Sequence, residues 1–309
     1  MDRRFLQESG VGIFTGNELI VKGGLESRVA LITGYPGSPV AEVFDAAERV
    51  KELLAEKGIL AQIANNEALA GARLNGSQME GIRALAVMKS VGAHVASDAL
   101  ALGNMAGTGP GGAVVAVFGD DIWSEGTQVP ADSRFIAQHL YMPVVEPSTY
   151  QEMKDWIGLA LDLSEGSRLF VAYVVTSNQA DGGGTVQVSP NRFPGLTTNN
   201  PSTIRTASIP VDDRVIIPPH TAAKEVEVLE RRLPRLLELA RQFGMNRLLY
   251  PGEGRKQIGF ITSGISYCYI EHVLQMVGLT GTIPILKLGV TYPVDDRAVK
   301  ALAEQVDEI

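Results

Sequence analysis

The feature that most constrains this chain is a unit that recurs through its first half: a short, mostly apolar run, a turn, and then a helical pattern. The apolar runs lie at 29–33, 59–63, 113–118, 142–145 and 169–175. Runs of this kind, without polar alternation, are typical of strands buried on both faces. Helices between such strands favour parallel pairing with right-handed crossovers. We therefore expect an α/β fold with a doubly wound parallel sheet of about five strands.

Local signals predict where the helices between these runs begin. Ser38 and Pro39 suit an N-cap and a first helical position, so we expect a helix over 38–58. Glu67 opens a helical stretch that is interrupted near 75–76 and resumes over 79–95. A match to the capping box at 148–151 predicts the start of a further helix.

The second half of the chain follows a different pattern. Glycines, prolines and polar residues at 181–219 predict an irregular connection. Beyond it we expect helices at 222–243, 265–277 and 295–306 and strands at 258–262 and 283–288. We divide the chain into a first domain at 1–190, a linker with a bridging helix at 191–254, and a partial second α/β domain at 255–309. Roughly 55 residues are too few for a complete doubly wound domain, which suggests a fragment of a longer gene product.

Composition excludes several classes of function. Asp and Glu number 35 against 27 Lys and Arg, a formal charge of −8, so we expect no nucleic-acid or membrane surface. A single cysteine, Cys268, cannot hold an iron–sulfur cluster, and the four histidines lack zinc-site spacing. The N-terminus lacks a secretory apolar segment, and no apolar run of about 20 residues occurs. We expect a cytoplasmic protein without a metal ligand set, and any electron carrier lies elsewhere.

Residues 107–112 match the pattern GxGxxG. A dinucleotide site needs this pattern after a strand and at the start of a helix, so that the pyrophosphate meets the helix N-terminus. Here the glycines precede the strand expected at 113–118. A flexible entry loop is the favoured interpretation, and a nucleotide site is the weaker alternative.

Three polar segments follow predicted strands, at the edge where open α/β sheets bind ligands. The turn at 34–39 allows close backbone approach, although a tight capped turn explains it equally well. Glu67 can share a proton with a ligand if it is desolvated, although a first-turn glutamate that favours the helix dipole is the plainer reading. Asp120 and Asp121 open a long loop; such a pair can bind Mg²⁺ but is more often a solvated turn.

Taken together, these segments resemble motifs of the thiamine-diphosphate-dependent 2-oxoacid:ferredoxin oxidoreductases, of the indolepyruvate type. The matching stretches are Gly-Tyr-Pro-Gly-Ser-Pro at 34–39, Asn-Glu at 66–67, Arg-Ala…Met-Lys…Gly at 83–92, Asp-Asp at 120–121 through Asp-Ser-Arg at 132–134, and the segments 261–267 and 286–293. The resemblance covers about residues 10–180 and 255–305.

The resemblance implies a thiamine diphosphate-binding fold, with a pyrimidine domain first and part of a transketolase C-terminal-like domain after it. Glu67 matches the glutamate that hydrogen-bonds N1′ of the aminopyrimidine, so that the cofactor serves as its own base. The other implied cofactor-binding residues are Tyr35, Pro36, Gly37, Ser38, Asn66, Asp120 and Asp121. The implied substrate-binding residues are Thr33, Gln128 and Arg134.

The implied reaction is oxidative decarboxylation of a 2-oxoacid, with indolepyruvate or another aryl or branched acid expected, electrons passing to ferredoxin and the acyl group to coenzyme A. No Gly-Asp-Gly…Asn motif occurs, so Mg²⁺ and the iron–sulfur clusters are implied to lie in regions or subunits absent from this chain. The expected partner is a diphosphate-binding domain or subunit, within a homo- or hetero-oligomer. Ile122 and Trp123 stand where the family has Pro-Gly, which leaves open an alternative: a noncatalytic assembly or regulatory protein with the same fold.

Overall fold

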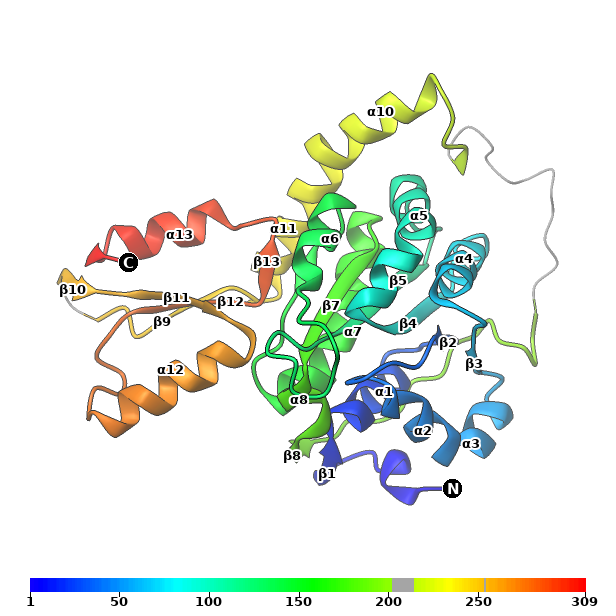
Figure 1. Cartoon of the computed structure of the whole chain (residues 1–309), viewed down its shortest axis with the longest axis horizontal. Helices are drawn as coiled ribbons and strands as arrows, with labels where there is room; N and C mark the ends of the chain where they lie inside the picture. The colour runs from blue at the N-terminus through cyan, green and yellow to red at the C-terminus, as the bar shows by residue number, and fades with distance from the viewer. Residues whose placement is uncertain (202–213, 253) are drawn as a thin grey trace.

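A seven-stranded sheet forms the centre of the computed structural model, which describes residues 1–201, 214–252 and 254–309 (Figure 1). The strand order is β13-β6-β7-β5-β4-β2-β3, and every pair is parallel except β13 with β6. The strands are β2 (Leu31–Gly34), β3 (Leu60–Ile63), β4 (Arg83–Lys89), β5 (Ala113–Asp120), β6 (Val144–Val145), β7 (Val171–Thr176) and β13 (Val290–Tyr292).

Helices cover both faces of this sheet. One face packs against α1 (Gly16–Glu26), α2 (Glu42–Arg49), α3 (Lys51–Glu56), α7 (Tyr150–Ser167) and α11 (Leu233–Gln242). The other packs against α4 (Glu67–Ser77), α5 (Ser90–Ala106) and α6 (Ser133–His139). Strand β5 is buried along its whole length, as an apolar run between two helical layers requires. The expected doubly wound α/β fold is confirmed.

The prediction of a helix over 79–95 is wrong, and this is the largest correction. Residues Arg83–Lys89 form β4, which pairs with β2 on one side and β5 on the other. A fully apolar run has no polar face, so its periodicity cannot distinguish a buried strand from a buried helix. The helix begins one residue later, at Ser90. The expected five strands become seven with β4 and β13 added.

Three other helices differ from the expectations. The helix expected at 38–58 begins only at Glu42, with Ala41 rather than Ser38 as N-cap, and is broken at Val50. The capping residue of α7 is Thr149, whose hydroxyl accepts a hydrogen bond from the Glu152 amide at 3.2 Å. The expected helix at 222–243 divides into α10 (His220–Glu227), a π-helical turn (Val228–Arg232) and α11.

The connection expected to be irregular contains a strand. Within 181–219, β8 (Gly183–Gln187) pairs antiparallel with β1 (Val11–Thr15), a strand that the sequence pattern did not reveal. The part of this connection at 202–213 lies outside the described residues.

The last residues form a small lobe beside the main sheet (Figure 1). Its three-stranded sheet has the order β11 (Phe260–Ser263), β12 (Ile285–Leu288), β9 (Arg247–Leu249), and β10 (Lys256–Ile258) pairs with β14 (Val306–Glu308). Helix α12 (Gly264–Met276) agrees with the expected helix at 265–277, and the expected strand at 258–262 divides at Gly259. Helix α13 (Asp296–Ala303) is shorter than the expected 295–306, because Val306 begins β14. Strand β13 then leaves the lobe and joins the main sheet. None of the helices in the described ranges is long and apolar enough to cross a membrane.

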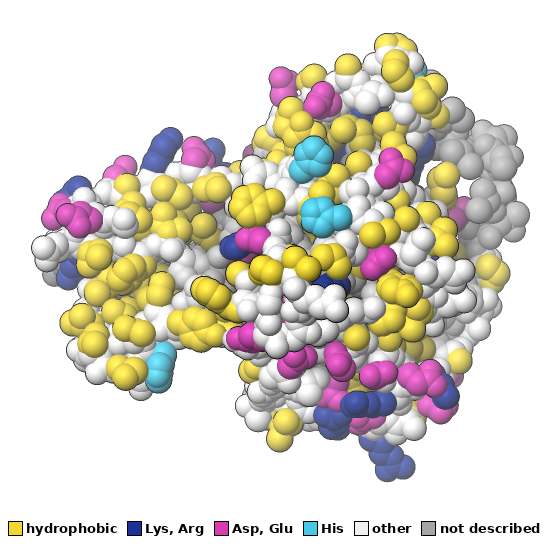
Figure 2. Space-filling view, viewed as in Figure 1, with side chains coloured by type: hydrophobic (Ala, Val, Ile, Leu, Met, Phe, Trp, Pro, Cys, Tyr) yellow, Lys and Arg dark blue, Asp and Glu magenta, His cyan; other side chains and the backbone are white. Residues whose placement is uncertain are grey.

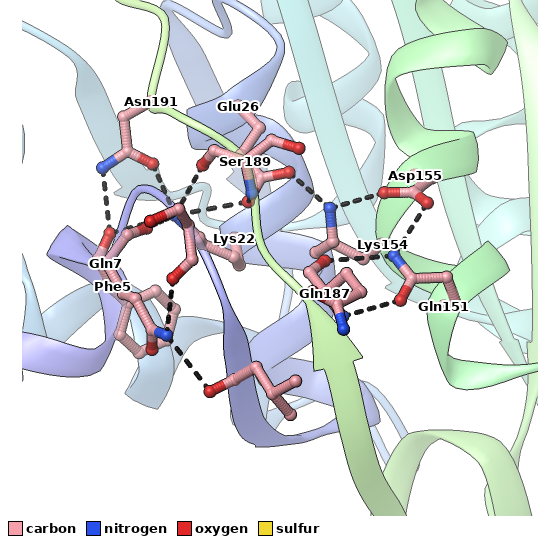
Figure 3. A network of polar contacts seen from close by, with 12 residues as sticks. Phe5, Gln7, Lys22, Glu26, Gln151, Lys154, Asp155, Gln187, Ser189 and Asn191 are labelled. Carbon is pink, nitrogen blue, oxygen red and sulfur yellow. Dashed lines mark hydrogen bonds and ion pairs between the residues drawn. The ribbon is translucent and has the colours of Figure 1, made fainter.

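A buried network of two lysines holds the N-terminal segment against the sheet domain (Figure 3). Lys22 and Lys154 are both fully buried, and both contact the carboxylate of Glu26, at 3.3 and 2.5 Å. Lys22 also donates to the Gln7 carbonyl and to Asn191 Oδ1, each at 2.8 Å. Lys154 also pairs with Asp155 at 2.5 Å, so Glu26 is the carboxylate that the two buried lysines share, and burying a charge is costly unless it is paired.

Candidate active site

The carboxyl ends of β2, β3, β4 and β5 lie side by side at one edge of the sheet. The chain passes from β2 outward to β3 and then returns to the other side of β2 as β4. The strand order therefore reverses between β2 and β4, and in open α/β sheets ligands bind in the crevice at such a switch point. The three polar segments singled out in the sequence all lie at this edge.

The turn after β2 needs glycine at its first position. Gly34 has φ +141°, and a Cβ there would lie 2.8 Å from the Val87 amide nitrogen of β4, so another residue would not fit. The Tyr35 amide donates to the Val87 carbonyl at 3.1 Å, which fixes the turn to β4. Tyr35, Pro36 and Ser38 are exposed, and Gly37 is half-buried. The turn is thus rigid at its base and open to a ligand at its tip.

Glu67 is the first residue of α4 and is half-buried. Asn66 is the N-cap, and its Oδ1 accepts a hydrogen bond from the Leu69 amide at 2.9 Å. The Glu67 side chain lies against Gly92 in the first turn of α5, where a Cβ would come within 2.7 Å of Glu67 Cγ. Within the described chain Glu67 forms no ion pair. Its carboxyl group is therefore positioned by packing and keeps its hydrogen-bonding capacity.

Lys89 also lies at this edge, where the sequence pattern did not place it. It ends β4, between the turn after β2 and the end of β5, and its Cβ would lie 2.8 Å from a Cβ on Gly37. It is half-buried and makes no ion pair with any residue that the structure describes. The Met-Lys motif was visible in the sequence, but the incorrect helix over 79–95 removed it from the edge of the sheet.

Asp120 ends β5 and is almost completely buried. Its carboxylate accepts hydrogen bonds from the Ser133 amide at 2.8 Å and the Ser133 hydroxyl at 2.5 Å. Burial raises the pKa of Asp120 to about 7, against the opposing effect of these two hydrogen bonds. The residue joins the two ends of the loop that follows β5.

Asp121 organises the same loop from inside. Burial acts to raise its pKa, but the amides of Gly126 and Glu125, at 2.9 and 2.8 Å, outweigh this and lower the pKa of Asp121. Both aspartates are thus committed to the loop, and no group of metal-ligating side chains occurs in the parts of the chain that the structure describes. Gln128, farther along the loop, is exposed.

The expected substrate-binding residues do not form one cluster. Thr33 is buried on β2; its hydroxyl donates to the Gln62 carbonyl at 3.0 Å and accepts from Arg73 at 3.2 Å. Arg134, in the first turn of α6, pairs with Asp132 at 2.5 Å and lies 3.8 Å from Glu146. Thr33 is thus buried next to β3, whereas Arg134 lies near β6, toward the other end of the row of strands.

The GxGxxG segment lies away from this site. It follows the C-terminal end of α5 and leads into the first residue of β5, at the amino edge of the sheet. No helix begins after it, so no helix N-terminus faces its glycines. The position agrees with an entry loop rather than a dinucleotide site.

Comparisons with known proteins give relatives of one kind. No family model matches the chain. The indolepyruvate oxidoreductase subunit IorA of Archaeoglobus fulgidus is 30% identical over 295 residues, covering 95% of this chain and 45% of its own length. The subunit of the same name from Methanothermobacter marburgensis is 30% identical over 281 residues, covering 90% and 42%. This chain is related to the IorA subunits. The resemblance expected from the motifs is thereby confirmed, and the chain spans less than half the length of these relatives.

A solved structure shows the same fold at much lower sequence similarity. It is the 2-oxoglutarate:ferredoxin oxidoreductase from Magnetococcus marinus, determined with 2-oxoglutarate, coenzyme A and succinyl-CoA bound. The match has a TM-score of 0.70 and 15% identity, and covers 96% of this chain and 57% of that chain. At this identity the likeness establishes the fold, and it extends over both the sheet domain and the small lobe.

Proposed function

We propose that this chain provides the aminopyrimidine side of a thiamine diphosphate site in a 2-oxoacid:ferredoxin oxidoreductase. The position of Glu67 carries the proposal. A carboxyl group that pairs with no cation among the described residues lies at the switch point of the sheet, and a glycine in the neighbouring helix leaves room for it. The IorA relatives favour indolepyruvate or another aryl or branched 2-oxoacid as substrate, and a cytoplasmic location is part of the proposal.

The residues at this edge fit the pyrimidine half of the cofactor. Glu67 would hold a proton between its carboxyl group and the ring nitrogen N1′, while the exposed turn at Tyr35–Gly37 would contact the ring from the β2 side. Lys89 would place a positive charge between them. When bound, the cofactor would supply the nucleophilic carbon that adds to the carbonyl of a 2-oxoacid. Asp120 and Asp121 would shape the loop over the site rather than bind a metal.

The other half of the site would come from a diphosphate-binding domain or subunit. Five large hydrophobic side chains beside the site are 41–82% exposed, and four of them lie in the early turns of helices that follow sheet strands: Leu69, Val91, Val95, Trp123 and Phe135. Figure 2 shows hydrophobic side chains on the face formed by α5 and α6. Clustered exposed apolar groups of this size mark interaction surfaces. The partner, with ferredoxin and coenzyme A, would complete an oligomeric enzyme.

The test is Glu67→Gln in the enzyme assembled with its partner subunits, assayed as ferredoxin reduction with a panel of aryl and branched 2-oxoacids. The amide keeps the size of the side chain but cannot hold the shared proton. We expect turnover to fall by about 10²-fold or more, the size typical of a lost general acid–base group.

Glu80→Gln is the matched control, because Glu80 lies just beyond the far end of α4 and is likewise half-buried. It should leave turnover unchanged. Equal turnover of the two variants and the wild-type enzyme would exclude the proposed role of Glu67 and favour a noncatalytic protein that keeps the fold.

A further inference from the structure

Glu146 connects the candidate site to the small lobe. It follows β6 and is 8% exposed. Its Oε1 accepts a hydrogen bond from the Thr291 hydroxyl at 2.6 Å, and its Oε2 lies 3.4 Å from the Ser263 hydroxyl. Thr291 belongs to β13 and Ser263 to β11, so both contacts come from the chain segment that builds the small lobe and joins it to the main sheet.

On its other side Glu146 faces Arg134. The Arg134 guanidinium is held along one edge by Asp132, with Nε and Nη2 at 2.8 and 2.5 Å from the two carboxylate oxygens. The remaining nitrogen, Nη1, lies 3.8 Å from Glu146 Oε2. Asp132 thus fixes one edge of the planar group, and Glu146 attracts the other end from the buried side.

We infer that Glu146 is a positioning residue that holds the Arg134 guanidinium in place, while Thr291 and Ser263 hold the Glu146 carboxylate. The inference rests on the proposed function, for which the resemblance implies that Arg134 is a substrate-binding residue. Burial raises the pKa of Glu146 above its ordinary value, and the Thr291 hydroxyl and the charge of Arg134 offset this shift only in part.

Glu152 supplies a matched control. Like Glu146 it is a buried carboxylate that binds the small lobe: its Oε1 accepts from Lys287 at 2.5 Å and from Arg247 at 2.6 Å. It makes no contact with Arg134. Loss of its charge should therefore loosen the lobe without releasing Arg134.

The first experiment needs no enzymatic activity. The chain is treated with phenylglyoxal, and modification of each arginine is followed by peptide mass spectrometry. Glu146→Gln should speed the modification of Arg134 by about threefold or more and leave Arg247 unchanged, since a guanidinium held by one anion is freer than one held by two. Glu152→Gln should speed the modification of Arg247 and leave that of Arg134 unchanged. Thr291→Val, which keeps the carboxylate but removes its anchor, should have a smaller effect on Arg134.

Two results would overturn the inference: an unchanged rate at Arg134 in Glu146→Gln, or an equal increase in both glutamate variants, which would indicate general loosening. In the assembled enzyme, Glu146→Gln should raise KM for the 2-oxoacid by about tenfold with kcat within about threefold. An unchanged KM despite a released Arg134 would also contradict the inference. An inactive wild-type enzyme would instead refute the proposed function, since the reactivity of Arg134 is measured without turnover.

Discussion

Replacing Gly92 by alanine tests the position of Glu67 without touching its carboxyl group. The added methyl carbon would lie 2.7 Å from Glu67 Cγ, whereas carbon atoms at contact are about 3.7 Å apart. The Glu67 side chain must therefore move by about 1 Å, and a misplacement of this size can cost about 100-fold in rate. We expect Gly92→Ala to lower kcat/KM of the assembled enzyme by about this factor.

The stability of the chain should hardly change, because alanine in a helix is favoured over glycine by about 0.5–1 kcal/mol and offsets the cost of moving a flexible side chain. Gly76→Ala in α4 is the control, since no atom lies within 4 Å of the Cβ that it would add. Thermal unfolding should show both variants folded, with ferredoxin reduction lost only in Gly92→Ala. Comparable activity in the two variants would refute the placement of Glu67.

Two further predictions concern buried charges. Burial raises the pKa of Asp120 to about 7 in the folded chain, against an ordinary value of 3.8. Asp120 therefore lowers the free energy of unfolding as the pH rises from about 4 to about 7, by about 4 kcal/mol at most. Asp120→Asn should remove this pH dependence, which urea unfolding of the variant and the wild-type chain at pH 5 and pH 8 would measure. If the free energy of unfolding falls equally in both proteins between these pH values, the burial argument is wrong. Glu26→Gln should lower the free energy of unfolding by about 3 kcal/mol or more, because two buried lysines lose their shared partner, whereas Glu56→Gln on the surface should cost less than about 0.5 kcal/mol. A loss below 1 kcal/mol for Glu26→Gln would show that the network is not held by this charge.

The fold class was predictable because its signal is local. The apolar runs that became β2, β3, β5 and β7 are short, bounded by turns and separated by helical patterns, and these features need no knowledge of tertiary contacts. Strand β4 was not predictable in this way, because its inner residues 84–88 are all apolar and only its position between β2 and β5 makes it a strand. Strands β1 and β8 are short and partly exposed, and each is stabilised by the other although paired residues such as Val11 and Gln187 are 176 positions apart in the sequence.

The candidate site shows the same division. Glu67, the turn at 34–39 and the aspartate pair could be found because each directly follows a predicted strand. The role of Gly92 in making room for Glu67 could not be found, because it depends on how α4 and α5 pack. The contacts of Arg134 with Glu146, and of Glu146 with Thr291, join residues up to 145 positions apart, and no local pattern encodes them.

The most direct measurement is a crystal structure of the assembled enzyme with thiamine diphosphate bound. We predict that a Glu67 carboxyl oxygen lies about 2.6–3.2 Å from N1′ of the aminopyrimidine ring, beside the turn at Tyr35–Gly37. A ring bound elsewhere, or a Glu67 side chain paired with another residue and turned away from N1′, would contradict it.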